Sequence, residues 1–389
     1  MEKLKIRLLA FRGAPAEIFE KAAERLAGLL PADTYTLADS SPDILFFLSG
    51  GSEQEAIRYT LPSRFLLLIG SRHGNAYASA TEVKAYLDHR KIPAMLLDEE
   101  EEETREMLRL SLIARNALKN LCGKKLGLIG EVSEWLIAST VPVYLLQSVL
   151  GIWPVKIPWS GLPPYSQFDP SPSLPELFDR AGSPGLTGTA RVHAMLEHAI
   201  RQHGLDAITV ECFPMVKRDH VTACLSLAKF NHEGFPAGCE GDLASAAGMM
   251  LCRELTGTVP WMANINKVTA AGCHFSHCTI APGLVTDFTV TTHFETGEGT
   301  AIAGDFNGDR VTVFRFDNQL GQAFIATGEI TERPRSATAC RTQIVVKLDE
   351  EDAQTLKEHP LGNHHLILPG DHTRLLYLTC LVIGIGVQA

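Results

Sequence analysis

Acidic residues and histidines follow apolar runs at several points of the chain, where catalytic and metal-binding side chains are often held. Glu211 ends the run AITV, Glu240 and Asp242 open GCEGDLASAAGMMLCRELTG, and His364 and His365 stand in GNHHLILPGDH. Carboxylates and a neutral imidazole form a mixed oxygen and nitrogen site suited to a divalent metal such as Mn²⁺. Carboxylates at a helix entrance also cap the free N–H groups of the first turn. Residue type and spacing therefore leave a metal site and plain helix capping both open.

A second stretch rich in potential ligands is AGCHFSHCTIAPG, with Cys273, His274, His277 and Cys278. Four such side chains could bind a structural zinc ion. Adjacent Cys-His pairs are awkward for one tetrahedral ion, however, and the sequence offers no distant partner pair. We therefore expect one of the two histidines to face an active cleft while the cysteines pack in the interior.

The overall composition limits the classes of partner. The 389 residues suggest two or three domains, and the formal charge of −10 without a Lys/Arg block argues against nucleic acid. The first apolar run, KLKIRLLAF, predicts a strand, and the last, RLLYLTCLVIGIGVQA, is too short and glycine-rich to span a bilayer. Nine cysteines without a CxxC pair fit free thiols. We expect a cytoplasmic protein without a membrane partner.

Periodicity divides the chain into three predicted domains. Residues 1–122 alternate strands and helices, which predicts a parallel sheet covered on both faces. Residues 123–257 begin a second α/β domain at KKLGLIGEVSEWLIAS, read as a strand, a turn and a helix. This domain carries Glu211 and Asp242. The expected fold class is α/β, with two parallel-sheet domains followed by a third, different domain.

Residues 258–389 change to short alternating runs, which predict an antiparallel β-barrel-like domain carrying His364. FNGD, at residues 306–309, separates two of these runs and predicts a hairpin. The apolar run near the end of the chain predicts a buried helix or strand.

Five motifs, taken together, resemble the L-fucose isomerase and L-arabinose isomerase family of metal-dependent ketol isomerases. They are VECFP, GCEGDLASAAGMMLCRELTG, PWMANI, HCTIAPG and GNHHLILPGDH, all in the second half of the chain. The first half matches mainly in its α/β organisation. The resemblance implies Mn²⁺, or another divalent metal, bound by Glu211, Asp242 and His364, with Glu240 as an alternative to Asp242. It also implies that Glu211 and Asp242 transfer the proton. Which of His364 and His365 faces the metal stays open.

The same resemblance suggests residues that bind the substrate. GSRHGNAYASATEV and GEVSEWLIAS look like family segments that line the sugar pocket, and a further histidine lies near the metal. The implied substrate-binding residues are Arg72, His73, Asn75, Glu131, Ser133, Trp135, His274 and His277. A helix-entry turn with exposed side chains and a tryptophan in the core are the plainer alternatives for the two segments.

The function implied is interconversion of an aldose and a ketose through an ene-diol, with a deoxy- or anion-bearing sugar as one option. A homo-oligomer with pockets near subunit contacts would follow from the family. Two alternatives stay open: an epimerase or lyase with the same metal chemistry, and a non-catalytic sugar-binding protein. The chain is shorter than the fucose isomerases, so the resemblance does not assign the residues of the pocket wall that selects the sugar.

Overall fold

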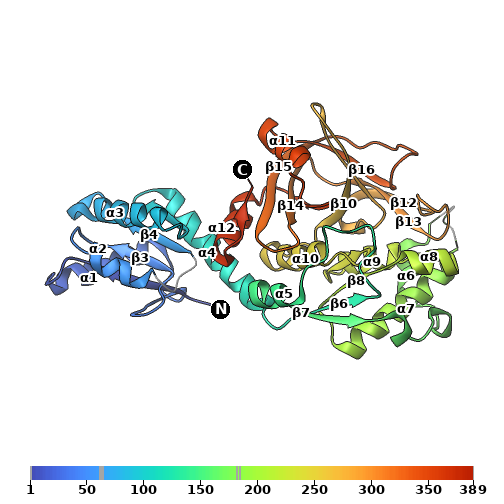
Figure 1. The fold of residues 1–389 in the computed structure, drawn as a ribbon, viewed down its shortest axis with the longest axis horizontal. Helices are drawn as coiled ribbons and strands as arrows, with labels where there is room; N and C mark the ends of the chain where they lie inside the picture. Colours follow the sequence, from blue (N-terminus) through green and yellow to red (C-terminus); the bar gives the residue numbers. More distant parts are fainter. Residues whose placement is uncertain (1, 61–64, 181–182, 184, 389) are drawn as a thin grey trace. The chain divides into compact units, whose positions relative to one another are not determined.

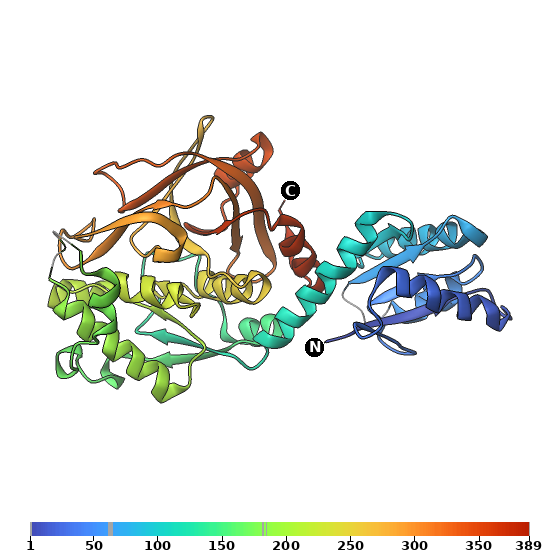
Figure 2. The same cartoon turned by 180° about the vertical axis from the view of Figure 1, so that it is seen from behind.

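The computed structural model describes residues 2–60, 65–180, 183 and 185–388. The chain divides into two compact units. Unit 1 comprises residues 1–119 and 374–385, and unit 2 comprises residues 120–373 and 386–389. Figure 1 shows the chain coloured along the sequence, and Figure 2 shows it from behind. Among the described residues, no helix combines the length and the apolar character needed to cross a membrane.

Unit 1 contains a five-stranded parallel sheet in the order β2-β1-β3-β4-β5. Its strands are β1 (Leu4–Leu9), β2 (Tyr35–Leu37), β3 (Ile44–Phe47), β4 (Leu66–Gly70) and β5 (Ala94–Asp98). Its α-helices are α1 (Ala16–Leu29), α2 (Glu53–Ala56) and α3 (Ala76–His89), together with most of α4 (Glu102–Leu121) and of α12 (Thr373–Ile383). Strands β3 and β4 are buried along their whole length, as expected for a parallel sheet covered on both faces.

Unit 2 begins with a four-stranded parallel sheet in the order β7-β6-β8-β9. These strands are β6 (Lys125–Ile129), β7 (Trp153–Ile157), β8 (Ala207–Val210) and β9 (Ala237–Cys239). Its helices are α5 (Val143–Leu150), α6 (Ser173–Phe178), α7 (Thr187–His203), α8 (Phe213–Asp219), α9 (Cys224–His232) and α10 (Leu243–Thr256). The register pairs Val210 with Cys239, so Glu211 and Glu240 leave the carboxyl ends of neighbouring strands. In parallel sheets this edge is where ligands bind.

The second main part of unit 2 is a closed antiparallel barrel of six strands. Their order is β14-β17-β10-β11-β16-β15, closed by pairing of β14 with β15. The strands are β10 (Trp261–Thr269), β11 (Gly272–His277), β14 (Arg310–Phe316), β15 (Gln322–Glu332), β16 (Thr342–Lys347) and β17 (His364–Pro369). A two-stranded sheet of β12 (Val285–Thr291) and β13 (Ala301–Phe306), helix α11 (Glu350–Glu358) and strand β18 (Gly386–Val387) complete the unit.

Helix α10 joins the parallel sheet to the barrel. It contacts β8 and β9 on one side and β14 and β17 on the other, and Figure 1 shows it between these two layers. Gly248 permits the close approach, because a Cβ there would lie 2.7 Å from Cδ1 of Leu366. The packing brings the start of α10, where Glu240 and Asp242 lie, against the barrel strand that begins with His364.

The predicted fold class is confirmed in its main features, with parallel-sheet α/β regions followed by an antiparallel barrel. The apolar run near the C-terminus forms helix α12, one of the two predicted options. The second parallel sheet and the barrel, assigned above to different domains, lie in the same compact unit. The division into three domains, with boundaries after residues 122 and 257, stays a prediction.

Two local predictions are wrong. Among the described strands, β13 pairs with β12 while β14 pairs with β15 and β17, so residues 306–309 connect two sheets instead of closing a hairpin. The Asn-Gly dipeptide sets a local turn, but burial of apolar faces decides which strands pair. The helix expected at SEWLIAS begins only at Val143, because the preceding residues form a loop held by the contacts described below.

His193 on α7 gives a testable dependence of stability on pH. Burial, and then the charge of Lys229, lower the pKa of His193 to about 4. As the pH falls, the unfolded chain therefore binds a proton at His193 before the folded chain does. The neutral, buried His193 makes its full contribution to the stability of the fold above pH 6.5, and this contribution is lost as the pH falls to 4. We expect about 3 kcal/mol of unfolding free energy to depend on this residue over that interval. Urea unfolding of His193→Leu and the parent between pH 4 and 7 measures it.

His193→Gln separates the two properties of this side chain. Neither ring nitrogen of His193 has a hydrogen-bond partner among the described residues. Leucine removes both the titration and the unpaired polar atoms, so His193→Leu should also gain stability at pH 7. Glutamine removes only the titration. If the unfolding free energy of the parent and of both variants changed equally with pH, His193 would not be the source of the predicted pH dependence.

Candidate metal centre

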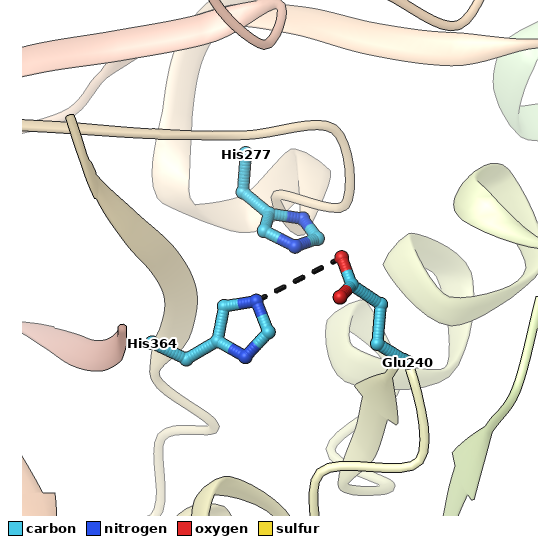
Figure 3. Close-up of side chains that lie close together, drawn as sticks. All are labelled: Glu240, His277 and His364. Carbon is cyan, nitrogen blue, oxygen red and sulfur yellow. Dashed lines mark ion pairs between the residues drawn. The ribbon is translucent and has the colours of Figure 1, made fainter. Parts of the chain in front are cut away.

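Three side chains from different elements of unit 2 converge on one point. Glu240 follows β9, His277 ends β11 and His364 begins β17, and one ligand atom of each lies within 4.8 Å of the others. Figure 3 shows the carboxylate and the two imidazoles directed toward one another. Both histidines are buried, and the Glu240 side chain is 12% exposed. Across the described ranges, it is the one cluster of at least three His, Cys, Asp or Glu side chains with this geometry.

His364 has one ring nitrogen satisfied and one free. Its Nδ1 lies 2.9 Å from Oδ2 of Asp242. Its Nε2 is buried without a hydrogen-bond partner and lies 3.8 Å from Oε1 of Glu240. When Nδ1–H donates to Asp242, the lone pair of Nε2 points at the cluster, which is the arrangement of a metal-binding histidine with a carboxylate behind it. An unpaired buried nitrogen is otherwise costly, so this atom fits a metal ligand.

His277 has a matching arrangement. Its Nδ1 lies 3.0 Å from Oγ1 of Thr279, so a proton on Nδ1 leaves the Nε2 lone pair free. Burial, and then the nearby rings of His364 and His293, hold the pKa of His277 well below its usual range. The imidazole is therefore neutral at physiological pH, the form that binds metals.

Glu240 is held in an unusual backbone conformation. Its φ is +61°, in the left-handed region that a residue with a Cβ seldom adopts. Its Oε2 accepts a hydrogen bond of 2.6 Å from Nε1 of Trp135, and its carbonyl accepts one of 2.9 Å from the Ser133 amide. Strained positions of this kind concentrate at functional sites. The turn directs the carboxylate toward the two histidines.

Asp242 is fully buried, and protein groups occupy both its oxygens. Oδ1 accepts from the Ser245 amide at 2.7 Å and so caps α10, while Oδ2 accepts from Ser245 Oγ at 2.9 Å and from His364. Burial alone would raise the pKa of Asp242, but the Arg315 guanidinium 3.5 Å away and the contacts with His364 hold it well below its usual range. The ionised carboxylate is placed to orient His364.

Arg315 belongs to this site, although we did not single it out from the sequence. Its buried guanidinium donates to the carbonyls of His364 and Ala138 and to the hydroxyls of Ser139 and Ser245. It therefore connects β14, β17, α10 and the loop after β6. The sequence feature that could have indicated a buried role for Arg315 is its place in VTVFRF. Strand alternation puts this arginine on the same face as two buried valines.

Glu211 lies at the carboxyl end of β8, outside the cluster of three. Its Oε2 accepts hydrogen bonds from the Glu131 amide at 2.8 Å and from Nε1 of Trp159 at 3.2 Å. Gly130 makes room for it, because a Cβ at this left-handed residue would overlap the carboxylate. The loop at residues 130–135 thus contacts Glu211 through one end and Glu240 through the other.

One of the two segments predicted to line a sugar pocket, GEVSEWLIAS, contains this same loop. Ser133 and Trp135 bind Glu240, and Glu131 is exposed and pairs with Lys156 at 2.6 Å. The Trp135 ring is 46% exposed and meets Phe213 edge-on, with centroids 4.8 Å apart. An aromatic surface therefore stands beside the carboxylate.

The remaining predicted residues lie elsewhere. His274 is three positions before His277 on β11, so strand alternation directs it to the other face. His365 packs near Phe275 and Phe324, and burial, followed by the charge of Arg315, lowers its pKa to about 3. His364, not His365, therefore faces the cluster.

Arg72, His73 and Asn75 lie in unit 1. Arg72 and His73 are exposed beside Glu100, at 3.3 and 3.4 Å, and Asn75 precedes α3. Their predicted role in substrate binding stays a prediction. Of the alternative zinc ligands, Cys273 and Cys278 belong to apolar clusters, and only His277 joins the group of three.

No protein-family model matches the chain, and no curated protein is significantly similar to it. Two neutral imidazoles and a carboxylate suit a divalent cation such as Mn²⁺, and three protein ligands leave coordination positions for substrate oxygens.

Proposed function

We propose that the protein is a metal-dependent aldose–ketose isomerase whose centre is formed by Glu240, His277 and His364. The observation that carries the metal site is the buried, unpaired Nε2 of His364 aimed at Glu240. The choice of an isomerase is supported by the order of the motifs that resemble the fucose and arabinose isomerases. Glu211, at the end of the strand beside Glu240, provides a second carboxylate for the reaction.

In this proposal Glu240, His277 and His364 hold Mn²⁺ or another divalent cation. The cation would act as a Lewis acid on the sugar oxygens at C1 and C2. Asp242 and Arg315 position His364, and Trp135 positions Glu240 through its indole N–H. The ligand set thus differs from the one suggested by the family motifs, because Glu240 and His277 take the places of Asp242 and Glu211.

Glu211 is the group that moves the proton. The two donors on its Oε2 fix the carboxylate, and Oε1 accepts no hydrogen bond from the described part of the chain. Glu211 takes the proton from C2 of the aldose and delivers a proton to C1. The hydroxyl proton on O2 moves to O1 through the ene-diol, so that C1–O1 becomes the alcohol and C2–O2 becomes the ketone. Asp242, initially paired with Glu211 in this role, is assigned to positioning because both its oxygens are occupied.

We include three further properties in the proposal: a homo-oligomer, a cytoplasmic location and a substrate that is a deoxy- or anion-bearing sugar. They follow from the resemblance and the composition. The partly exposed Trp135 ring beside Glu240 offers a flat apolar surface for one face of a sugar.

The test uses metal-stripped protein with and without added Mn²⁺, incubated with neutral and anionic aldoses in D₂O and followed by NMR. We expect ketose formation that requires Mn²⁺ and introduces deuterium at C1. Glu211→Gln should lower kcat by about 10²- to 10⁴-fold, the usual range for general acid–base catalysis, and should leave Mn²⁺ affinity unchanged. Glu176→Gln, an exposed carboxylate on α6, is the matched control.

Each other product would replace the proposal with a named alternative. A C2 epimer without ketose indicates an epimerase, and shorter carbon chains indicate a lyase. Sugar binding without turnover or any requirement for metal indicates a binding protein.

A further inference from the structure

Unit 1 contains a cavity of about 720 Å³ that the proposed metal chemistry does not use. Its lining comes from β1, the loop after β1, helix α1 and the segment after β3. The lining residues that bear on ligand chemistry are Arg7, Arg12, Arg58, Glu55, Phe11 and Phe19. These residues all lie in unit 1.

The cavity lies where the strand order of the sheet reverses. The chain passes from β1 to β2 on one side, and then returns to place β3 on the other side of β1. The loops after β1 and β3 therefore leave in opposite directions and open a crevice at the carboxyl edge of the sheet. Open α/β sheets bind their ligands at this switch point.

The charge of the lining favours an anion. Three arginines face one glutamate, in a chain whose formal charge is −10. Arg7 is already neutralised, since it pairs with Asp39 and with Glu55. Arg12 and Arg58 have no ion-pair partner within the described residues, and both are exposed. Two unpaired guanidinium groups on one cavity match the double negative charge of a phosphate monoester.

The lining also offers an apolar surface next to these charges. The rings of Phe11 and Phe19 are 42% and 39% exposed, which is unusual for phenylalanine. The Phe11 amide donates to Ser49 Oγ at 3.0 Å, which ties the loop after β1 to the end of β3. Phe11 is therefore held at the crevice rather than packed in the core.

We propose that this cavity binds a small phosphorylated ligand, with the phosphoryl group between Arg12 and Arg58 and the rest of the molecule against Phe11 and Phe19. The recognised group is a phosphate dianion, present as free phosphate or as the monoester of a sugar phosphate or a nucleotide. The site is independent of the metal centre, and its occupation requires neither metal nor turnover.

The experiment measures binding to the full chain, stripped of metal, by isothermal titration calorimetry. The probes are inorganic phosphate, glucose 6-phosphate and AMP, with glucose, adenosine and succinate as unphosphorylated comparisons. We expect at least one phosphorylated probe to bind, and Arg12→Gln/Arg58→Gln to weaken that binding by at least about 10-fold. The tightest of the three probes identifies the source of the phosphate.

Arg90→Gln is the matched control, because Arg90 is also in unit 1 but stacks on Tyr86 away from the cavity lining. Its affinity for the phosphorylated probe should equal that of the parent. Phe19→Ala should weaken AMP or glucose 6-phosphate more than inorganic phosphate, and circular dichroism verifies that each variant is folded. Absence of binding by inorganic phosphate, glucose 6-phosphate and AMP alike overturns the proposal. So does equal binding by succinate, or unchanged affinity in the folded double-arginine variant.

Discussion

Glu240→Gln is expected to lower the affinity of the protein for Mn²⁺ by more than about 100-fold and to abolish ketose formation. Loss of a residue that only supports a ligand already costs about 10- to 100-fold in metal affinity, and Glu240 supplies the only carboxylate of the cluster. The amide keeps the size of the side chain but removes the charge that two neutral imidazoles cannot replace. Titration of metal-stripped protein, with free Mn²⁺ followed by electron paramagnetic resonance, measures the change.

The same titration distinguishes the two possible ligand sets. Asp242→Asn should weaken Mn²⁺ binding by about 10- to 100-fold, because it disturbs only the carboxylate behind His364. Glu211→Gln and the surface control Glu176→Gln should leave the affinity unchanged. If Glu240→Gln binds Mn²⁺ normally while Glu211→Gln and Asp242→Asn lose it, the metal is held by the residues suggested by the motifs and the proposed cluster is incorrect.

Arg315→Met is expected to destabilise unit 2 by about 3 to 5 kcal/mol, because it leaves the buried carboxylate of Asp242 without its cation. Both side chains of this pair are almost completely buried, with Nη1 and Oδ2 3.5 Å apart. Methionine matches the aliphatic part of arginine, so a packing defect contributes little. Urea unfolding at pH 7 in the presence of EDTA measures the loss without a contribution from metal binding.

The double variant Arg315→Met/Asp242→Asn supplies the control. Removing the charge of Asp242 should recover part of the stability, since an uncompensated buried charge is the main cost of the single substitution. Recovery stays incomplete, because Arg315 also donates to Ala138 and Ser139 in the loop after β6. Additive effects of the two substitutions would show that the pair is not coupled and would contradict this explanation.

Local patterns predicted most elements of the fold. Alternation of apolar runs with amphipathic helices predicted the parallel sheets, and the change to short strands after residue 258 predicted the antiparallel barrel. Hydrophobic periodicity depends on residues that are close in the sequence, so it can be recognised without knowledge of the tertiary structure. The pairing of β13 was not predictable in this way, because the FNGD turn is local whereas the partner β12 is chosen by burial in a separate sheet.

For the site, the sequence by itself determined that acids and histidines occur in three short segments: GCEGD, HFSHC and GNHHL. Glu240 and His364 were candidate metal ligands, and the family resemblance suggested His277, Ser133 and Trp135 as substrate-binding residues. The structure places Glu240, His277 and His364 in one group. The sequence did not determine which acid of the pair faces the histidines. Glu240 and Asp242 are two residues apart, and only the left-handed turn at Glu240 and the cap made by Asp242 separate their roles.

Only the tertiary structure decided the other assignments. His364 and His365 point to opposite faces of β17, and which face meets Glu240 depends on how α10 packs between the sheet and the barrel. Arg315 lies about seventy positions from Asp242 in the chain and meets it only through that packing. Distances between side chains on different elements are set by layer packing, and layer packing is not encoded in the spacing of residues along the sequence.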